Sequence, residues 1–232
     1  MGKNNSQHRC KLGNDYLEAV ESTDDYLEAV ESTDNLGLLR VSASPCSYDH
    51  HVFRSVHKAY GTTYMILRGL CFRNPTIMRL IFTTYIRPIA EFASLLWTPT
   101  SVRSCDRFER VQRAFTKQVA GFYHLPYDRR LQLLNLDTMT IRLKKYKLCT
   151  MFKIIHRLID VPLSDINLSL AVTHTRSNGI RLVLPAPRTN HMLHSYSYST
   201  GKMWNSRPRT VVVAHSISLF KHRLARIDIA DL

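Results

Sequence analysis

The stretch that decides the fold is VRSCDRFERVQRAFTKQVAGF, residues 102–122. At about 100° per residue, its large apolar side chains fall within one arc of about 100°, as on a helix that packs against a core. This arc holds Phe108, Val111, Phe115, Gln118, Val119 and Phe122. Five basic residues fall within a second arc, centred about 130° away: Arg103, Arg107, Arg110, Arg113 and Lys117. The stretch therefore predicts an amphipathic helix, which Gly121 is well placed to end.

The residues before this stretch predict two further helices. The first covers about residues 51–70. The second begins at Asn74-Pro75, because asparagine caps a first turn and proline fits its first position. Pro88 should kink or split this helix, since proline has no N–H for the helical hydrogen bond. A second half is then expected over residues 92–97.

Two helices are also expected after the stretch. A short one follows Pro126, and a long one, capped by Thr138 or Thr140, runs to about Asp160. The apolar face of the long helix consists of Ile141, Leu148, Met151, Phe152, Ile155, Leu158 and Ile159. The opposite side carries Arg142, Lys145, Lys153 and Arg157. The long helix is thus predicted to be amphipathic, with a second basic face.

Beyond residue 162 the helical pattern weakens. Residues 180–184 alternate weakly and could form a strand, which Pro185 and Pro187 would stop. Ser216 is expected to cap a final helix. The predicted fold is therefore mainly α: a helical bundle with a loop-rich C-terminal segment and little β structure.

Charge is unevenly distributed along the 232 residues, whose formal net charge is +14. Residues 1–50 carry a net charge of −5, and residues 51–232 carry +19. A strongly basic segment favours a polyanionic partner, because each neutralised phosphate releases condensed counterions. Membrane surfaces and acidic proteins are anionic as well, so charge alone does not choose among the three.

The chain shows none of the patterns of a secreted or membrane-spanning protein. Its five cysteines lie far apart and form no CxxC pair, which argues against a disulfide scaffold. The most apolar stretch, residues 77–97, contains three charged residues, and no apolar run follows Met1. We therefore expect an intracellular protein, nuclear or cytoplasmic, without a membrane span. Gly2 and Ser6 match the N-myristoylation pattern, so association through an acyl chain stays open.

No enzymatic or metal-binding motif stands out. The sequence holds no nucleophile elbow and no glycine-rich phosphate loop, and its histidine pairs have no further ligands at zinc spacing. The decapeptide DYLEAVESTD occurs twice in tandem, over residues 15–34. Its junction creates Asp24-Asp25, an acidic pair that could hold Mg²⁺ but is more simply a product of the duplication.

Short signatures follow one another in a definite order from Tyr85 onward. They are Tyr85-x-Arg87-Pro88, Glu91-Phe92-Ala93-Ser94, Trp97-x-Pro99, Asp106, Glu109-Arg110-Val111-Gln112-Arg113, Thr116-Lys117, Gly121 and Tyr127-x-x-Arg130-Leu131-x-x-Leu134. In this order they resemble the segment that follows the palm in reverse transcriptases of non-LTR (LINE-type, jockey-like) retrotransposons.

The resemblance extends in both directions and covers about residues 26–228. Trp204-Asn205-Ser206-x-Pro208 and Phe220-Lys221-x-x-Leu224 resemble the tail of the same polyproteins, although Arg207 stands where the family usually has leucine. Upstream, residues 33–38 resemble the stretch that ends the palm. The resemblance implies that Leu36, Gly37 and Leu38 belong to a hairpin that contacts the primer terminus.

The resemblance also implies what to expect of catalysis. The family's aromatic-x-Asp-Asp motif, whose carboxylates hold the Mg²⁺ ions of the intact polymerase, is not found in this sequence. We therefore expect no polymerase activity and no cofactor from these residues alone. The expected partner is RNA, DNA or an RNA–DNA hybrid, bound without sequence specificity, and the palm region is a second candidate partner.

The sequence is thus interpreted as a fragment of an RNA-directed DNA polymerase that retains the thumb-like binding region. Its nine expected phosphate-binding residues are Arg103, Arg107, Arg110, Arg113, Lys117, Arg142, Lys145, Lys153 and Arg157. The alternative is a degenerate, non-binding helical relic or a protein-interaction module. Four segments are expected: acidic residues 1–35, poorly ordered; 36–60, a palm-hairpin remnant and connector; 61–162, the thumb-like domain; and 163–232, the tail.

Overall fold

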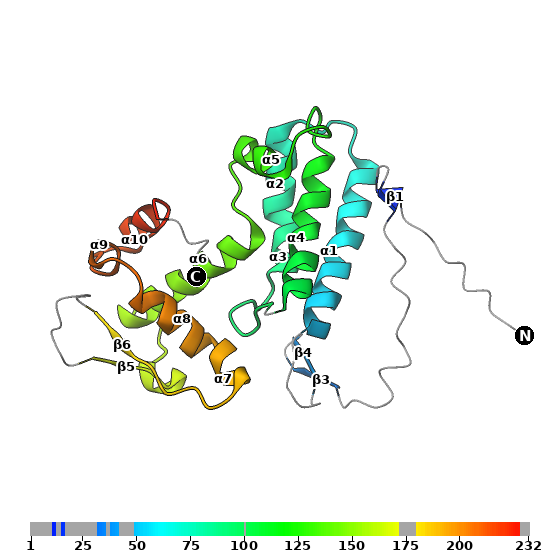
Figure 1. Cartoon of the computed structure of the whole chain (residues 1–232). Coiled ribbons are helices and arrows are strands. Elements are labelled where there is room, and N and C mark those ends of the chain that lie inside the picture. The colour runs from blue at the N-terminus through cyan, green and yellow to red at the C-terminus, as the bar shows by residue number, and fades with distance from the viewer. Residues whose placement is uncertain are drawn as a thin grey trace, which may run out of the picture. The chain divides into compact units, whose positions relative to one another are not determined.

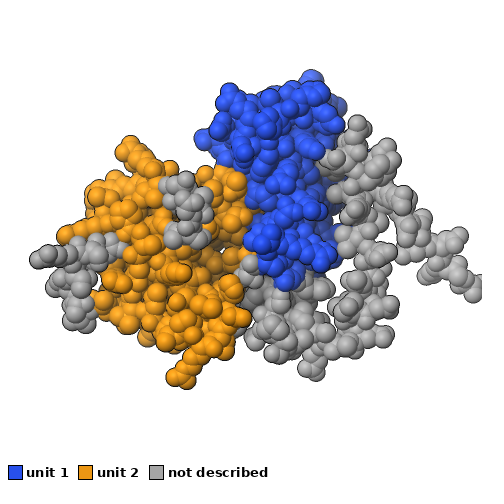
Figure 2. Space-filling model, in the orientation of Figure 1, with its two compact units in different colours: residues 1–92, 101–136 blue, residues 93–100, 137–232 orange. Residues whose placement is uncertain are grey.

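The computed structural model describes residues 11–12, 15–16, 32–35, 38–41, 49–99, 101–171 and 180–227. The chain forms two compact units, shown in different colours in Figure 2. Unit 1 comprises residues 1–92 and 101–136, and unit 2 comprises residues 93–100 and 137–232. The division after residue 136 falls inside segment 61–162, for which the sequence predicts a single domain.

Unit 1 is a bundle of helices, in agreement with the mainly α prediction. Its helical elements are α1 (Asp49–Gly69), α2 (Pro75–Ile81), the π-helix η2 (Phe82–Ile86), α3 (Arg87–Ala90), α4 (Val102–Lys117) and α5 (Tyr127–Leu134). α1, α3 and α4 lie side by side (Figure 1). Helix α1 begins at Asp49, so it starts within the segment 36–60 that was expected to be a connector.

Short strands precede the bundle. β1 (Lys11–Leu12) pairs with β2 (Asp15–Tyr16), and β3 (Ser32–Asn35) pairs antiparallel with β4 (Leu38–Val41). Of the expected primer-contacting hairpin, Leu38 begins β4, whereas Leu36 and Gly37 lie outside the described residues, as do Gly2 and the Asp24-Asp25 pair.

Capping side chains fix the starts of α2 and α4 in unit 1. Asn74 Oδ1 accepts a hydrogen bond from the Ile77 amide at 2.8 Å, which confirms the predicted cap of α2. Ser101 Oγ accepts one from the Ser104 amide at 3.1 Å and caps α4. Each cap satisfies an amide that has no partner within its own helix.

The helix that begins at Pro75 changes its hydrogen-bonding pattern just before Pro88. The chain passes from α2 through η2 into α3, where Pro88 occupies the first turn. The amide of Arg87 bonds to the carbonyl of Phe82, five residues back, so the π-turn absorbs the irregularity before the proline. The expected second half over residues 92–97 is wrong, because Ala93 adopts a left-handed conformation with φ of 52° and the segment forms turns.

Helix α4 buries the face that the sequence predicts, but it is shorter. It ends at Lys117, and Val119 and Phe122 reach the core from a turn that includes Gly121 at φ 81°. Phe115 and Phe82 pack with their ring centroids 5.1 Å apart at the centre of unit 1. The fully buried apolar side chains of this core include Met78, Phe82, Ile86, Ala90, Phe108 and Phe115.

Unit 2 contains more helix than the sequence predicts. Its elements are α6 (Met139–Ile155), the 3-10 helix η3 (Leu163–Ile166), β5 (Ser169–Leu170), β6 (Leu182–Val183), α7 (Asn190–His194), α8 (Tyr196–Asn205), α9 (Arg209–Val212) and α10 (Ile217–Leu224). Thr138 and Ser216 cap α6 and α10, as expected. β5 and β6 pair antiparallel and include part of the predicted strand. The segment expected to be loop-rich thus holds three additional helices, α7 to α9.

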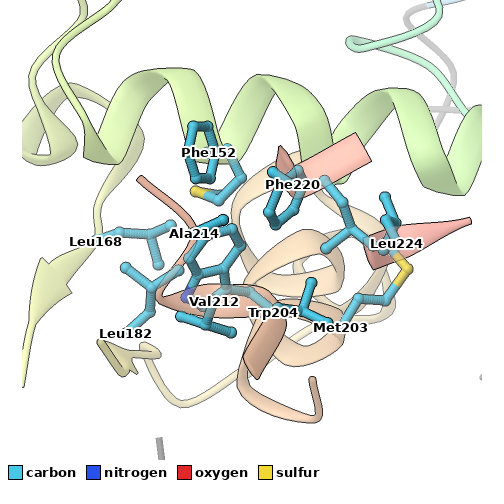
Figure 3. Close-up of a cluster of buried hydrophobic side chains, with 12 residues drawn as sticks. Phe152, Leu168, Leu182, Met203, Trp204, Val212, Ala214, Phe220 and Leu224 are labelled. Carbon is cyan, nitrogen blue, oxygen red and sulfur yellow. The ribbon is translucent and has the colours of Figure 1, made fainter. Parts of the chain in front are cut away.

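The core of unit 2 forms around Trp204, which is fully buried (Figure 3). Phe220 stacks between two rings, with its centroid 4.6 Å from Phe152 and 5.8 Å from Trp204. Trp204 Nε1 donates to the Ile180 carbonyl at 3.0 Å, and the Asn205 side chain bonds both backbone groups of Leu182. The Asn205 amide therefore attaches β6 to α8, and the indole attaches the residue two positions before β6.

Helix α6 ends earlier than expected. It stops at Ile155, and Arg157 adopts a φ of 52° while the Leu158 amide bonds back to the Lys153 carbonyl at 2.8 Å. Leu158 and Ile159 therefore do not continue the apolar face, and Leu158 is 60% exposed. No helix in the described part of the chain is long and apolar enough to cross a membrane.

Candidate nucleic-acid interface

The basic face of α4 is accessible, but part of its charge is neutralised. Arg103, Arg110 and Arg113 are exposed, and Arg107 and Lys117 are half-buried. Asp106 forms an ion pair with Arg110 at 2.8 Å and a longer one with Arg113 at 3.6 Å. A single carboxylate thus offsets two of the five cations expected to bind phosphate, although exposed ion pairs of this kind are weak.

Aromatic rings flank the same face. The guanidinium of Arg107 lies 5.6 Å from the ring centroid of Phe53 on α1, and that of Arg113 lies 5.1 Å from Tyr127 on α5. Burial raises the pKa of Tyr60 on α1 to about 12, with Asp106 adding to the rise and Arg110 and Arg113 opposing it. These rings hold the arginine side chains in place along the edges of α4.

Several of the signature residues serve the structure of unit 1 and do not face solvent. Tyr127 donates a hydrogen bond to Glu109 Oε1 and accepts one from Gln112 Nε2 at 3.2 Å. Burial and the neighbouring Glu109 carboxylate raise the pKa of Tyr127 far above its usual value. We call Glu109, Gln112, Tyr127 and Arg130 the α4–α5 polar network, because their interactions join these two helices.

Arg130 is the most deeply placed cation of this network. It is 2% exposed, and its Nη1 donates to the Arg113 carbonyl and to Thr116 Oγ1, each at 2.9 Å. Its guanidinium also lies 5.4 Å from the ring centroid of Tyr127. Burial lowers its pKa. In the sequence, Arg130 stands out only as a member of one signature. Because its side chain is buried, it cannot contact a large ligand directly.

The basic face of α6 belongs to unit 2. Arg142, Lys145 and Lys153 are half-buried, and Arg157 is exposed just beyond the end of the helix. Lys145 Nζ lies 2.7 Å from Asp137 Oδ2, whereas Lys153 and Arg157 form no ion pair within the described residues. The nine predicted cations are therefore divided, with five on α4 in unit 1 and four on or near α6 in unit 2.

The sequence names Lys221 on α10 only as a member of the tail signature and not among the nine cations, but it lies close to the basic face of α6. Burial raises the pKa of Cys149 on α6, and Lys221, Lys153 and Lys145 oppose this rise, in that order of strength. Three lysines from two helices therefore act on one thiol. Only the packing of α10 on α6 brings Lys221 to this place, so no local sequence pattern could have indicated it.

The tail signature also contains a buried cation. Arg207 is buried, and its Nε donates to the Met203 carbonyl at 3.1 Å within the turn that ends α8. Burial lowers its pKa. The position where the resembling family has leucine is thus an interior position in this chain, and an arginine occupies it.

Lys147 is a buried amine that the sequence patterns did not single out. It is 4% exposed, and burial alone lowers its pKa to about 8. Its ammonium group forms no ion pair or hydrogen bond within the described residues. An unpaired charge in this position is destabilising, because the protein interior solvates it less well than water does.

We expect Lys147→Met to stabilise the protein at pH 7 by about 3 kcal/mol, because each unit of pKa shift corresponds to about 1.4 kcal/mol. Below pH 8 both the folded and unfolded states of the natural chain carry the charge, and the full cost is present. Between pH 8 and 10.5 the folded state loses the proton first, so its stability rises with pH. Urea unfolding at about pH 7 and about pH 10 measures the free energy of unfolding of both chains. The gain in stability from Lys147→Met should be smaller at the higher pH, and an equal gain at both pH values would contradict this explanation.

The described residues contain no group of three histidine, cysteine or acidic side chains that could hold a metal ion. Comparisons with models of protein families, with curated proteins and with solved structures find no match to this chain.

Proposed function

We propose that the chain corresponds to the palm end, thumb and tail of a non-LTR retrotransposon reverse transcriptase, and that it binds the backbone of RNA, DNA or an RNA–DNA hybrid. The observation that carries the proposal is that none of the nine predicted cations is buried, in a chain of net charge +14. The order of the sequence signatures supports the family. Guanidinium and ammonium groups on accessible helix faces can form charge-assisted hydrogen bonds to phosphates irrespective of base sequence.

The proposed role is binding and not catalysis. In the resembling polymerases the two Mg²⁺ ions are held by palm aspartates, and the signatures matched here lie downstream of them. Unit 1 would then act as a thumb-like grip, with α4 facing the sugar-phosphate strands. The α4–α5 polar network would keep that helix in position.

The test is fluorescence anisotropy of a labelled RNA–DNA hybrid with the full chain at increasing salt. Binding to about four phosphates predicts a loss of affinity of about 100-fold between about 50 and 200 mM salt. Asp106→Asn should tighten binding about twofold, because it releases Arg110 and Arg113 from their shared carboxylate. Arg110→Ala with Arg113→Ala should weaken it about fivefold.

The matched control is the pair Arg68→Ala and Arg79→Ala, which removes equal charge from exposed positions on α1 and α2. This pair should change the affinity less than twofold. Absent or salt-independent affinity would refute the proposal. If light scattering also shows association that increases with protein concentration, the relic or interaction-module alternative is favoured. The exposed apolar side chains of Met65, Phe72 and Leu80 in unit 1 would form the associating surface.

A further inference from the structure

Most of the excess positive charge belongs to unit 2 and not to the thumb-like unit 1. Unit 2 contains 15 basic and five acidic residues, a net charge of +10, and unit 1 contains 17 basic and 13 acidic residues, a net charge of +4. The net charge of unit 2 therefore attracts a polyanion more strongly than the net charge of unit 1 does.

Three of the 15 basic residues of unit 2 lie on one side of α6. At about 100° per residue, five side chains fall within an arc of about 100° on this helix. They are Arg142, Lys145, Tyr146, Cys149 and Lys153. Tyr146 is 48% exposed, so about half of this side chain is open to solvent on the same side of α6 as three cations.

Helix α10 contributes a fourth cation to this place. Lys221 is exposed, and of the three lysines that act on the Cys149 thiol it acts most strongly. The stack of Phe152 on Phe220, with centroids 4.6 Å apart, fixes α10 against α6. The cations are therefore held on a common, packed core before any ligand arrives. We call Lys145, Tyr146, Lys153 and Lys221 the α6–α10 cluster.

The α6–α10 cluster keeps most of its charge available. Asp137 pairs with Lys145 at 2.7 Å, but Lys153 and Lys221 form no ion pair within the part of the chain that the structure describes. The like charges repel one another when no ligand is present. A bound row of phosphates would relieve this repulsion and release counterions.

An exposed ring between cations favours one kind of polyanion. Proteins that bind single strands combine a positively charged track with aromatic side chains on which unpaired bases stack. The bases of a duplex are already stacked and cannot use Tyr146 in this way. An amphipathic helix that binds a membrane needs exposed aliphatic side chains, and the arc of α6 around Tyr146 presents none.

We propose that the α6–α10 cluster is a binding site for single-stranded nucleic acid, in which Lys153 and Lys221 bind phosphates and an unpaired base stacks on Tyr146. The proposal rests on the proposed function, since it assumes a nucleic-acid ligand. It goes further by placing the single-strand site in unit 2, with Lys221 and Tyr146 as new members.

The test compares a labelled oligo(dT) of about 20 nucleotides with a hairpin duplex of the same charge, both bound to the full chain. The natural chain should bind the single strand several-fold more tightly. Lys153→Ala with Lys221→Ala should weaken single-strand binding about tenfold. The same pair should lower the salt slope by about 1.4, because each phosphate neutralised on a single strand accounts for roughly 0.7. Tyr146→Ala should weaken binding at least about fivefold, and Tyr146→Phe, which keeps the ring, less than twofold.

The control pair Arg188→Ala and Lys202→Ala removes the same charge from exposed positions in unit 2 that do not act on Cys149. It should leave single-strand binding within twofold. Acetylation of lysines, read by mass spectrometry, should show Lys153 and Lys221 protected by the oligonucleotide and Lys202 unprotected. This readout reports binding at the lysines directly and would not change if the variants acted only on folding.

The outcomes separate this proposal from the proposed function. If both charge pairs weaken binding equally, or if Tyr146→Ala binds normally, the site is wrong while general nucleic-acid binding stands. Equal affinity for duplex and single strand would likewise overturn it. If neither nucleic acid binds, both proposals fail, and binding to phosphatidylserine vesicles instead would identify a membrane surface as the partner.

Discussion

Trp204→Ala should destabilise unit 2 by about 3–5 kcal/mol, the range for removing a fully buried aromatic side chain. The indole fills the centre of the core, stacks near Phe220 and donates to the Ile180 carbonyl, so the substitution leaves a cavity and an unpaired acceptor. Urea unfolding monitored by the fluorescence of Trp97, which is buried in the same unit, measures the loss.

Two further variants locate the effect in the core. Trp204→Phe keeps a ring in the cavity and should lose about half as much. Val213→Ala, in the same unit but 47% exposed, should lose less than about 0.5 kcal/mol. If Trp204→Ala and Val213→Ala unfold at similar urea concentrations, the core described around Trp204 does not exist in solution.

Arg130→Ala should destabilise unit 1 by about 3 kcal/mol, because hydrogen bonds to charged groups are worth about 1.5–3 kcal/mol each when buried. The substitution removes both donors to the Arg113 carbonyl and Thr116 Oγ1 and takes away the cation over Tyr127. The measurement is the urea midpoint of the helical circular dichroism signal.

The neighbouring residue supplies the control for this prediction. Arg129 lies on the same helix but is exposed, and its side chain bonds to that of Gln132, so Arg129→Ala should change stability by less than about 0.5 kcal/mol. Arg130→Met keeps much of the volume of the side chain and should fall between the two. Equal effects of Arg129→Ala and Arg130→Ala would mean that the α4–α5 polar network contributes nothing to folding.

Local patterns in the sequence predict much of the fold. The apolar period of α4 identifies Phe108, Val111 and Phe115, all of which are buried. Asn74, Thr138 and Ser216 cap the helices that they were expected to cap, because capping depends on a few adjacent residues. The elements that were predicted well are those whose signals lie within their own segment.

The errors arise where distant residues decide the local structure. Helices α8 and α9 have weak periodicity, and they are held by the core around Trp204 and by the bonds between Asn205 and β6. Left-handed Ala93 ends the predicted helix over 92–97, although alanine gives no sign of such a backbone. Tertiary packing overrides propensity at both places.

The candidate site could be predicted only in part. Counting charges identifies the cations of α4 and α6, but it treats every arginine and lysine as solvent-facing. Arg130, Lys147 and Arg207 are buried instead, and no count of charges distinguishes them. Lys221, in contrast, is exposed, and it comes to lie beside the basic face of α6 only because α10 packs against that helix.

The path of the chain between the two units has a consequence for how the protein is made. Residues 93–100 belong to unit 2, although residues 101–136 return to unit 1 before the rest of unit 2 follows. During synthesis on a ribosome, residues 93–100 therefore emerge before the rest of unit 2 exists, and unit 1 is complete first. A shortened chain that begins at residue 137 therefore lacks residues 93–100, which belong to unit 2. Expression of unit 2 by itself should include those residues.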